Sequence, residues 1–412
     1  MRRFGPESAS PVTFAFWQVQ PEVVFDNIAR FAAETGVAVQ ATCVGGDYLE
    51  AMEDWQKAGR MPDVFYAQRA EAALWDAQGW LAVLDMADPV LQPTLAAMDA
   101  RLVQGAQREG RLLGLTYYNG GPFALLVHAD HLGRLPEQMP TDWAGIVALA
   151  RVLKRDGVAH PFLPRWHRSQ TGLAWSVLCM LASEGCTDLD APGAEAALTG
   201  VVQVLVDLWV GGLVPPESLD DAGDQPFLDR WVSGQHAMGF TMDYLVADAA
   251  RMAGRPVSLP TARLPGASGT PLMPGHALLC LRAGLEGVAR RNALALVVSL
   301  GGIAPDGTPR SHARWLADCL FAVPIAGLDR APAMVAAQRR HFPKGHADVA
   351  VSRMQTARAA AVCSPVTQDA YALAWSAEAD RMIRDDLLRH ARVLPKDAAA
   401  RLIASWRNRS HR

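Results

Sequence analysis

Residues 11–66 read PVTFAFWQVQPEVVFDNIARFAAETGVAVQATCVGGDYLEAMEDWQKAGRMPDVFY, and this stretch decides the fold. It contains three short runs rich in β-branched and aromatic residues, which predict strands at 11–17, 37–43 and 63–66. Between these runs the apolar residues recur at helical spacing, which predicts helices at 21–35 and 48–58. Such β-α-β-α-β alternation favours an α/β fold with a mostly parallel sheet and helices on both faces.

The rest of the chain extends this pattern. Further strands are predicted at 123–128, 236–241 and 274–281, and the chain after residue 300 is predicted to be mainly helical. Gly120 and Gly121 lie between two extended segments and suit a crossing between lobes. At 412 residues the chain is too long for one small core, so we expect two domains or two lobes of one unit.

The composition excludes several classes of protein. Half of the residues are hydrophobic and 20% are charged, which argues against intrinsic disorder. The net charge of -3 gives no electrostatic reason to bind nucleic acid or an anionic membrane. No stretch reaches the roughly 18 consecutive apolar residues of a membrane span. The six cysteines form no C-x-x-C pair, which favours buried thiols, although a Cys179–Cys186 disulfide stays open.

Motifs for catalysis and for nucleotide binding are missing from the sequence. It contains no G-x-x-x-x-G-K-[ST] loop, no G-x-G-x-x-G after a strand, no G-x-S-x-G elbow and no H-E-x-x-H. The sequence offers no recognisable set of nucleophile, general base and orienting residue. We therefore expect that the protein is not an enzyme and that it uses no cofactor and no metal.

Aromatic and polar residues instead follow the predicted strands. In open α/β sheets, ligands bind just beyond the carboxyl ends of the strands. The residues at such ends are Trp17, Gln18, Gln68, Tyr118, Asn119, Asp243 and Tyr244, and His276 opens the strand predicted at 274–281. A sugar offers an apolar face to Trp or Tyr and a rim of hydroxyls to Asp, Asn, Gln or His. The repeated position therefore indicates a site for a sugar.

These segments resemble the extracellular solute-binding proteins of carbohydrate ABC transporters, the maltose-binding-protein-like group. VTFAFW at 12–17 is similar to the first strand of that family, and MPDVFYAQRAEAALWDAQGWLAVLD at 61–85 is similar to its Pro-Asp-Val strand and the helix that follows. Further similar segments are GRLLGLTYYNGGPFALLVHADHL at 110–132, PTDWAGIVALARVLKRDG at 140–157, LVDLWVGGLVPPESL at 205–219 and FLDRWVSGQHAMGFTMDYLV at 227–246. Their order over most of the chain makes the resemblance specific.

The resemblance implies a two-lobed periplasmic-binding-protein-like fold of type II, with a ligand cleft between lobes that close about a hinge. Lobe one would comprise 11–120 and 266–310, and lobe two 121–265 and 311–412. Carried over by position, the ligand-binding residues would be Trp17, Gln18, Gln68, Tyr118, Asn119, Trp166, Asp243, Tyr244, His276 and Tyr371, with Trp375 as an alternative late aromatic. Arg165, His167 and Arg168 beside Trp166 either form a solvated basic loop or recognise an acidic sugar.

In function, the resemblance implies the substrate-binding component of an ABC importer, a monomer that binds a carbohydrate and delivers it to permease subunits. The family implies a periplasmic location. Because no apolar signal segment follows Met1-Arg2-Arg3, a cytoplasmic location stays open. Two other classes of function remain: a cytoplasmic ligand sensor or regulatory protein on the same fold, and an enzyme that uses His276 or His167 with Asp243 as acid and base.

Overall fold

The computed structural model describes residues 10–168, 171–273, 277–304 and 306–409, so His276 lies outside the described residues. The chain divides into two compact units. Unit 1 consists of the described residues of Met1–Gly120, Gly275–Met334 and Gln368–Ala370, and unit 2 consists of those of Gly121–Pro274, Val335–Thr367 and Tyr371–Arg412. Each unit is therefore assembled from three separate stretches of sequence.

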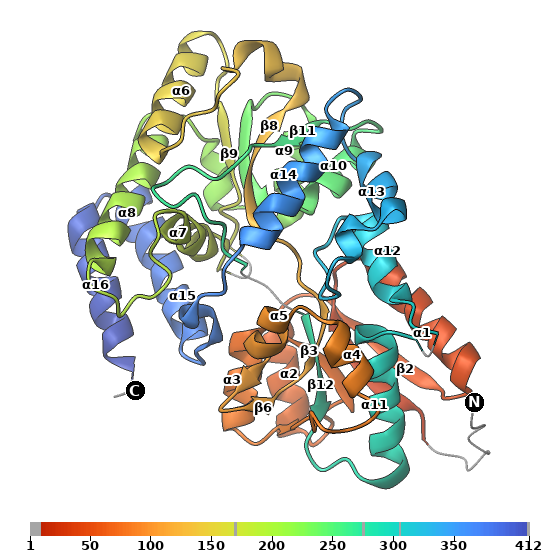
Figure 1. Cartoon of the computed structure of the whole chain (residues 1–412). Coiled ribbons are helices and arrows are strands. Elements are labelled where there is room, and N and C mark those ends of the chain that lie inside the picture. The colour runs from red at the N-terminus through yellow and green to blue at the C-terminus, as the bar shows by residue number, and fades with distance from the viewer. Residues whose placement is uncertain (1–9, 169–170, 274–276, 305, 410–412) are drawn as a thin grey trace. The chain divides into compact units, whose positions relative to one another are not determined.

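Unit 1 is built on a six-stranded sheet. Its strands are β1 (Val12–Trp17), β2 (Val39–Val44), β3 (Val64–Ala67), β4 (Leu81–Ala82), β7 (Leu115–Tyr118) and β12 (Ala277–Arg282), in the order β2-β1-β3-β12-β4, with β7 also paired to β12. β1 is parallel to β2 and β3, which confirms the parallel arrangement predicted from 11–66. β12 is antiparallel to β3, β4 and β7. In Figure 1 this teal strand lies among red and orange elements, because it comes from much later in the chain.

The helices of unit 1 begin and end at residues suited to those positions. α1 (Pro21–Thr35) begins with proline, and Gly36 ends it at φ 74°, in the left-handed region. α2 (Tyr48–Lys57) is capped by the Asp47 carboxylate, which accepts a hydrogen bond from Glu50 N at 3.0 Å. The unit also contains α3 (Arg69–Ala77), α4 (Gln92–Ala97), α5 (Ala100–Gly105), α11 (Gly287–Gly301), α12 (Arg310–Cys319) and the small hairpin of β5 (Gln107–Arg108) and β6 (Arg111–Leu112).

Unit 2 contains a four-stranded sheet in the order β11-β8-β10-β9. Its strands are β8 (Phe123–His128), β9 (Phe162–Pro164), β10 (Met238–Met242) and β11 (Ser258–Pro260). β10 is parallel to β9, and β8 is antiparallel to both β10 and β11, so β9, β10 and β11 all point the same way. The helices that follow these strands are α6 (Trp143–Arg155), α7 (Gly172–Ser183), α8 (Ala194–Val210), α9 (Asp224–Val232) and α10 (Leu245–Met252).

The chain beyond residue 305 is mainly helical, as predicted. It contains α13 (Pro332–Arg339), α14 (Ala347–Ala360), α15 (Ala372–Arg381), a π-helical segment (Met382–Arg389) and α16 (Pro395–Arg407), besides α12. α15 packs on α7 and α16 packs on α8, which places blue helices beside green ones in Figure 1. The C-terminal helices therefore complete the hydrophobic core of unit 2, to which Trp375 and Trp406 contribute.

The two units differ from the predicted lobes at three places, one of which is the short stretch Gln368–Ala370 that belongs to unit 1. Residues 266–273 belong to unit 2, where Gly266 N donates to Thr141 O and Ser268 N donates to Ser183 O, both at 2.9 Å. Residues 311–334 belong to unit 1, because α12 packs against α1, α11 and β7. The differences at 266–273 and 311–334 come from contacts between segments that are far apart in the chain, for which a local sequence pattern carries no signal.

Candidate functional site

In unit 1, predicted site residues gather at one edge of the sheet. β1, β3 and β7 point in the same direction, because β12 is antiparallel to both β3 and β7. Their carboxyl ends therefore share an edge, where the structure places Trp17, Gln18, Gln68, Tyr118 and Asn119. Gln18 is exposed there, and Asn119 N donates to Ala322 O at 2.7 Å. Residues from three separate strands are thus brought together within one unit.

An aromatic cluster at this edge holds Trp17. Its indole Nε1 donates a hydrogen bond to Tyr118 Oη at 2.6 Å. Its ring centroid lies 4.9 Å from that of Tyr66 and 5.4 Å from that of Tyr48, in edge-to-face geometry that favours such pairs. Tyr48 Oη in turn donates to Tyr66 O at 3.0 Å. Trp17 itself is half-buried, so its ring is fixed in place without being enclosed.

Gln68 is held by a buried carboxyl group. It is the N-cap of α3, and Glu71 Oε2 accepts a hydrogen bond from Gln68 N at 2.7 Å within a capping box. Burial raises the pKa of Glu71 to about 7, against the opposing effect of the Gln68 N–H. Glu71 did not stand out in the sequence, where its signal is only an acidic residue three positions after a helix N-cap. It lies directly behind a predicted ligand contact.

In unit 2, β9, β10 and β11 end at a common edge, and Asp243 follows β10 there. The Asp243 carboxylate forms a two-pronged ion pair with the Arg358 guanidinium of α14, at 2.7 and 3.1 Å. Both side chains are buried. Gly121, at φ 129°, is required beside this pair, because a Cβ atom at that position would come within 1.9 Å of Asp243 Oδ1. The Asp243 carboxylate is therefore fixed by α14 before any ligand arrives.

A second charged cluster follows β9. Arg165 Nε donates to Asp224 Oδ1 at 2.5 Å, and His167 Nε2 lies 3.3 Å from the same oxygen. Arg165 and His167 are buried, so they do not belong to a solvated loop, whereas Arg168 is exposed and pairs with Asp220 at 3.2 Å. Burial alone would raise the pKa of Asp224, but Arg165 and His167 hold it well below its usual range. Sequence reasoning missed Asp224, because its partner Arg165 lies 59 positions away in the chain.

The remaining predicted residues occupy different surroundings. Tyr244 immediately precedes α10, and burial raises the pKa of its hydroxyl. Trp166 is only 1% exposed and lies in the hydrophobic core of unit 2. Tyr371 packs against the same core, with its Oη 3.1 Å from Ser405 Oγ, and Trp375 Nε1 donates to Leu402 O at 3.0 Å. A tryptophan next to a predicted strand end can thus serve packing alone.

The strand-end edges offer aromatic rings, amides and paired charges, which suit the recognition of a polar ligand. Within the described ranges, no group of three or more His, Cys, Asp or Glu side chains is arranged to hold a metal ion. No helix in that part of the chain is long and apolar enough to cross a membrane.

Comparison of this chain with known proteins identifies its fold through similar solved structures. The sequence matches no protein-family model and no curated protein. The GacH receptor of Streptomyces glaucescens GLA.O, solved unliganded and with acarbose, matches at a TM-score of 0.76 and 17% identity, over 97% of this chain and 98% of its own. Maltose-bound MalE3 of T. maritima matches at 0.77 and 16% identity, over 97% and 99%. An ABC transporter solute-binding protein of Agrobacterium vitis S4 with bound D-mannitol matches at 0.71 and 16% identity, over 98% and 99%.

These matches cover nearly the whole of both chains, so they include both units and the helical C-terminal part. The chain therefore has the two-lobed α/β fold of the sugar-binding solute-binding proteins of ABC transporters.

Proposed function

We propose that the chain is the substrate-binding component of an ABC importer, which binds a carbohydrate and delivers it to permease subunits in a membrane. The observation that carries this proposal is the strand-end edge of unit 1. There Trp17, held by Tyr118, lies at the same edge as the amide side chains of Gln18, Gln68 and Asn119. Proteins with the same fold have been solved with acarbose, maltose and D-mannitol, which supports a sugar or polyol as the ligand.

The aromatic side chains and the amide side chains would contribute to sugar recognition in different ways. An aromatic ring contributes contact area to the apolar face of a sugar, and amides both donate to and accept from hydroxyl groups. A buried polar group left without a partner costs about 1–3 kcal/mol, so the polar residues select among sugars. We assign Asp243 and Tyr244 of unit 2 to the same ligand. Hinge closure of the two units would follow from better ligand contacts in the closed form.

A substitution in the aromatic cluster tests the assignment. We first identify a ligand by a thermal-shift screen of neutral and acidic mono- and oligosaccharides, and then measure its affinity by calorimetry. Trp17→Ala is expected to weaken binding about tenfold or more, because a central aromatic contact is lost. Trp55→Ala is the matched control, since Trp55 is also half-buried in unit 1 but lies on α2. Unchanged affinity in both Trp17→Ala and Tyr244→Ala would show that the site lies elsewhere.

We also propose that the protein works as a monomer outside the cytoplasmic membrane and releases its ligand chemically unchanged. The fold shared with solute-binding proteins of ABC transporters supports the location and the unchanged ligand. Cell fractionation, light scattering and analysis of the recovered sugar test them. Recovery of the protein in the cytoplasm would instead favour a ligand sensor on the same fold.

A further inference from the structure

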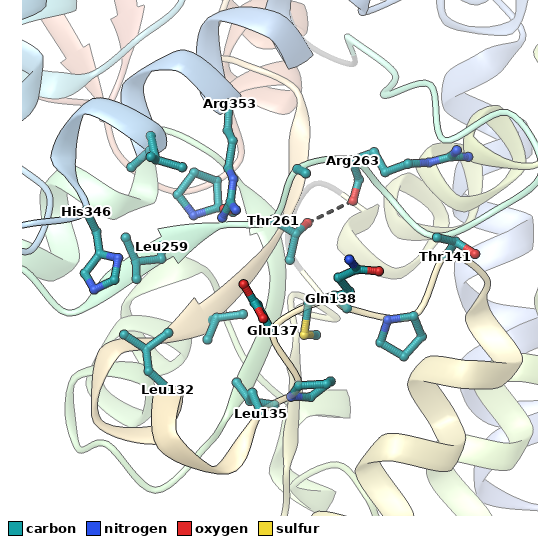
Figure 2. A pocket seen from close by; sticks show the side chains of 18 residues that line it. Leu132, Leu135, Glu137, Gln138, Thr141, Leu259, Thr261, Arg263, His346 and Arg353 are labelled. Atoms are coloured by element: carbon teal, nitrogen blue, oxygen red, sulfur yellow. Dashed lines mark hydrogen bonds between the residues drawn. The ribbon is translucent and has the colours of Figure 1, made fainter.

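Unit 2 contains a pocket that the proposed sugar site does not use. It encloses about 460 Å³, which lies within the range of small-molecule sites. Figure 2 shows its three walls: the loop at 132–141, the end of β11 with the residues after it, and the first half of α14. All three segments belong to unit 2, so the pocket is complete within that unit.

Apolar side chains line much of the pocket. Leu135 and Leu259 line it, and at its rim Val349 is 51% exposed and Leu132 is 37% exposed. A narrower apolar crevice of about 110 Å³ adjoins it. Arg353 lines both hollows, so the crevice opens beside its side chain. The crevice is walled mainly by apolar residues, among them Phe123, Leu125, Leu264, Pro271, Met354 and Ala357. Asp243, which is paired with Arg358, also lines it.

Two opposite charges face this apolar space. Arg353 Nη1 donates to Pro260 O at 3.1 Å, which fixes the guanidinium where the two hollows meet. Glu137 comes from the opposite wall, and in Figure 2 both side chains point into the pocket. Neither of them forms a salt bridge within the described part of the chain. Arg263, the other arginine of the wall, is turned toward its own loop, where Nη2 donates to Gly266 O at 2.7 Å.

We propose that this pocket binds a small zwitterion with an apolar side chain, namely a free apolar α-amino acid or a short apolar peptide. Arg353 takes the carboxylate through the N–H groups that do not bind Pro260. Glu137 takes the ammonium group, and the apolar side chain enters the crevice beside Arg353. An acid without an ammonium group would place its carboxylate in the field of Glu137, and an uncharged molecule would cover the half-buried Arg353 without pairing its charge.

Calorimetry on the full chain with four probes tests the proposal. The probes are L-leucine, L-leucyl-L-leucine, N-acetyl-L-leucine, which lacks the ammonium group, and L-leucinamide, which lacks the carboxylate. We expect saturable binding of leucine or of the dipeptide, and the tighter of the two identifies the source of the zwitterion. Each analogue that lacks a charge should bind severalfold more weakly, because a charge of the pocket then loses its partner.

Two variants separate this binding role from a purely structural one. Arg353→Gln is expected to weaken binding about tenfold, and the exposed Glu137→Gln severalfold, whereas Glu217→Gln, an exposed glutamate elsewhere in unit 2, should leave affinity unchanged. If Arg353 serves only to tie α14 to β11, Arg353→Gln lowers the melting temperature and Glu137→Gln does nothing. The absence of saturable binding by either zwitterion, or equal affinity in wild type and Glu137→Gln, would overturn the proposal. Sugar affinity is measured in the same samples as a separate readout. Arg353 and Glu137 are not among the residues assigned to the sugar, so their variants should leave sugar affinity unchanged, and loss of zwitterion binding alone identifies a failure of this site.

Discussion

At the residue scale, buried ionisable groups make stability depend on pH in opposite directions. Burial raises the pKa of Glu71 from 4.5 to about 7. The stability that the protonated Glu71 side chain contributes to the folded protein is therefore lost as the pH rises from 4.5 to about 7. Burial lowers the pKa of His128 and of His312 from 6.5 to about 4, so the stability that these neutral side chains provide is lost as the pH falls through that lower window. Taken together, these three groups make the folded protein most stable at an intermediate pH.

The variant Glu71→Gln isolates one of these contributions. The neutral amide keeps an oxygen that can accept from Gln68 N but cannot ionise. We expect the variant to gain up to about 3 kcal/mol of unfolding free energy over wild type at pH 8, and much less at pH 5. Urea unfolding followed by circular dichroism at both pH values measures this difference, with the exposed Glu50→Gln as the control. A gain of the same size at both pH values would contradict the pKa assignment.

At the element scale, one buried ion pair ties the end of β10 to α14. The carboxylate of Asp243 and the guanidinium of Arg358 are 115 positions apart in the chain and meet at 2.7 and 3.1 Å. Removal of one partner leaves the other charge buried without compensation, which is far more costly than removal of both.

A double-mutant cycle tests this connection. Arg358→Met is expected to lower the unfolding free energy by about 3–5 kcal/mol. Asp243→Leu combined with Arg358→Met should lose clearly less, because no uncompensated charge remains. Chemical unfolding of the four proteins gives the coupling energy. Losses that simply add up would mean that the two side chains act independently.

The same scale shows what the sequence could and could not predict. The strands and helices of 11–66, and the helices beyond residue 305, follow from local apolar spacing and were confirmed. The positions of several strand ends also follow from local sequence. The structure therefore places Trp17, Gln68 and Asp243 at the strand ends where the sequence predicts them. The packing of Trp166 in a core, the pairing of Asp224 with Arg165 and the return of α12 to unit 1 depend on long-range contacts, which local patterns do not encode.

At the scale of the whole molecule, buried cysteine thiols in both units can be used to follow the unfolding of each unit. All six cysteines lie in the described part of the chain and none of them forms a disulfide there, so Cys179 and Cys186 are not bonded to each other. Cys179 of unit 2 and Cys280 and Cys319 of unit 1 are buried, and burial raises the pKa of the Cys179 and Cys280 thiols. Because the thiolate is the reactive form, these positions combine low access with low reactivity.

Alkylation with iodoacetamide should therefore divide the thiols into two classes. In the native protein we expect Cys43, Cys186 and Cys363, which are only partly buried, to react first. The buried three should react only after unfolding, with Cys280 and Cys319 reporting unit 1 and Cys179 reporting unit 2. Mass spectrometry of digested samples measures each site over time. Alkylation of Cys280 as fast as that of Cys43 in native buffer would show that the core of unit 1 is open.

The place of β12 in the sheet of unit 1 has a consequence for synthesis on the ribosome. β12 pairs with β3, β4 and β7, yet it is translated after every strand of unit 2. Until residues 277–282 emerge, the nascent chain carries the first strands of unit 1 with unpaired edges while unit 2 is still being made. Unpaired strand edges are sites of aggregation, so this interval is the period in which the newborn chain most needs protection by chaperones.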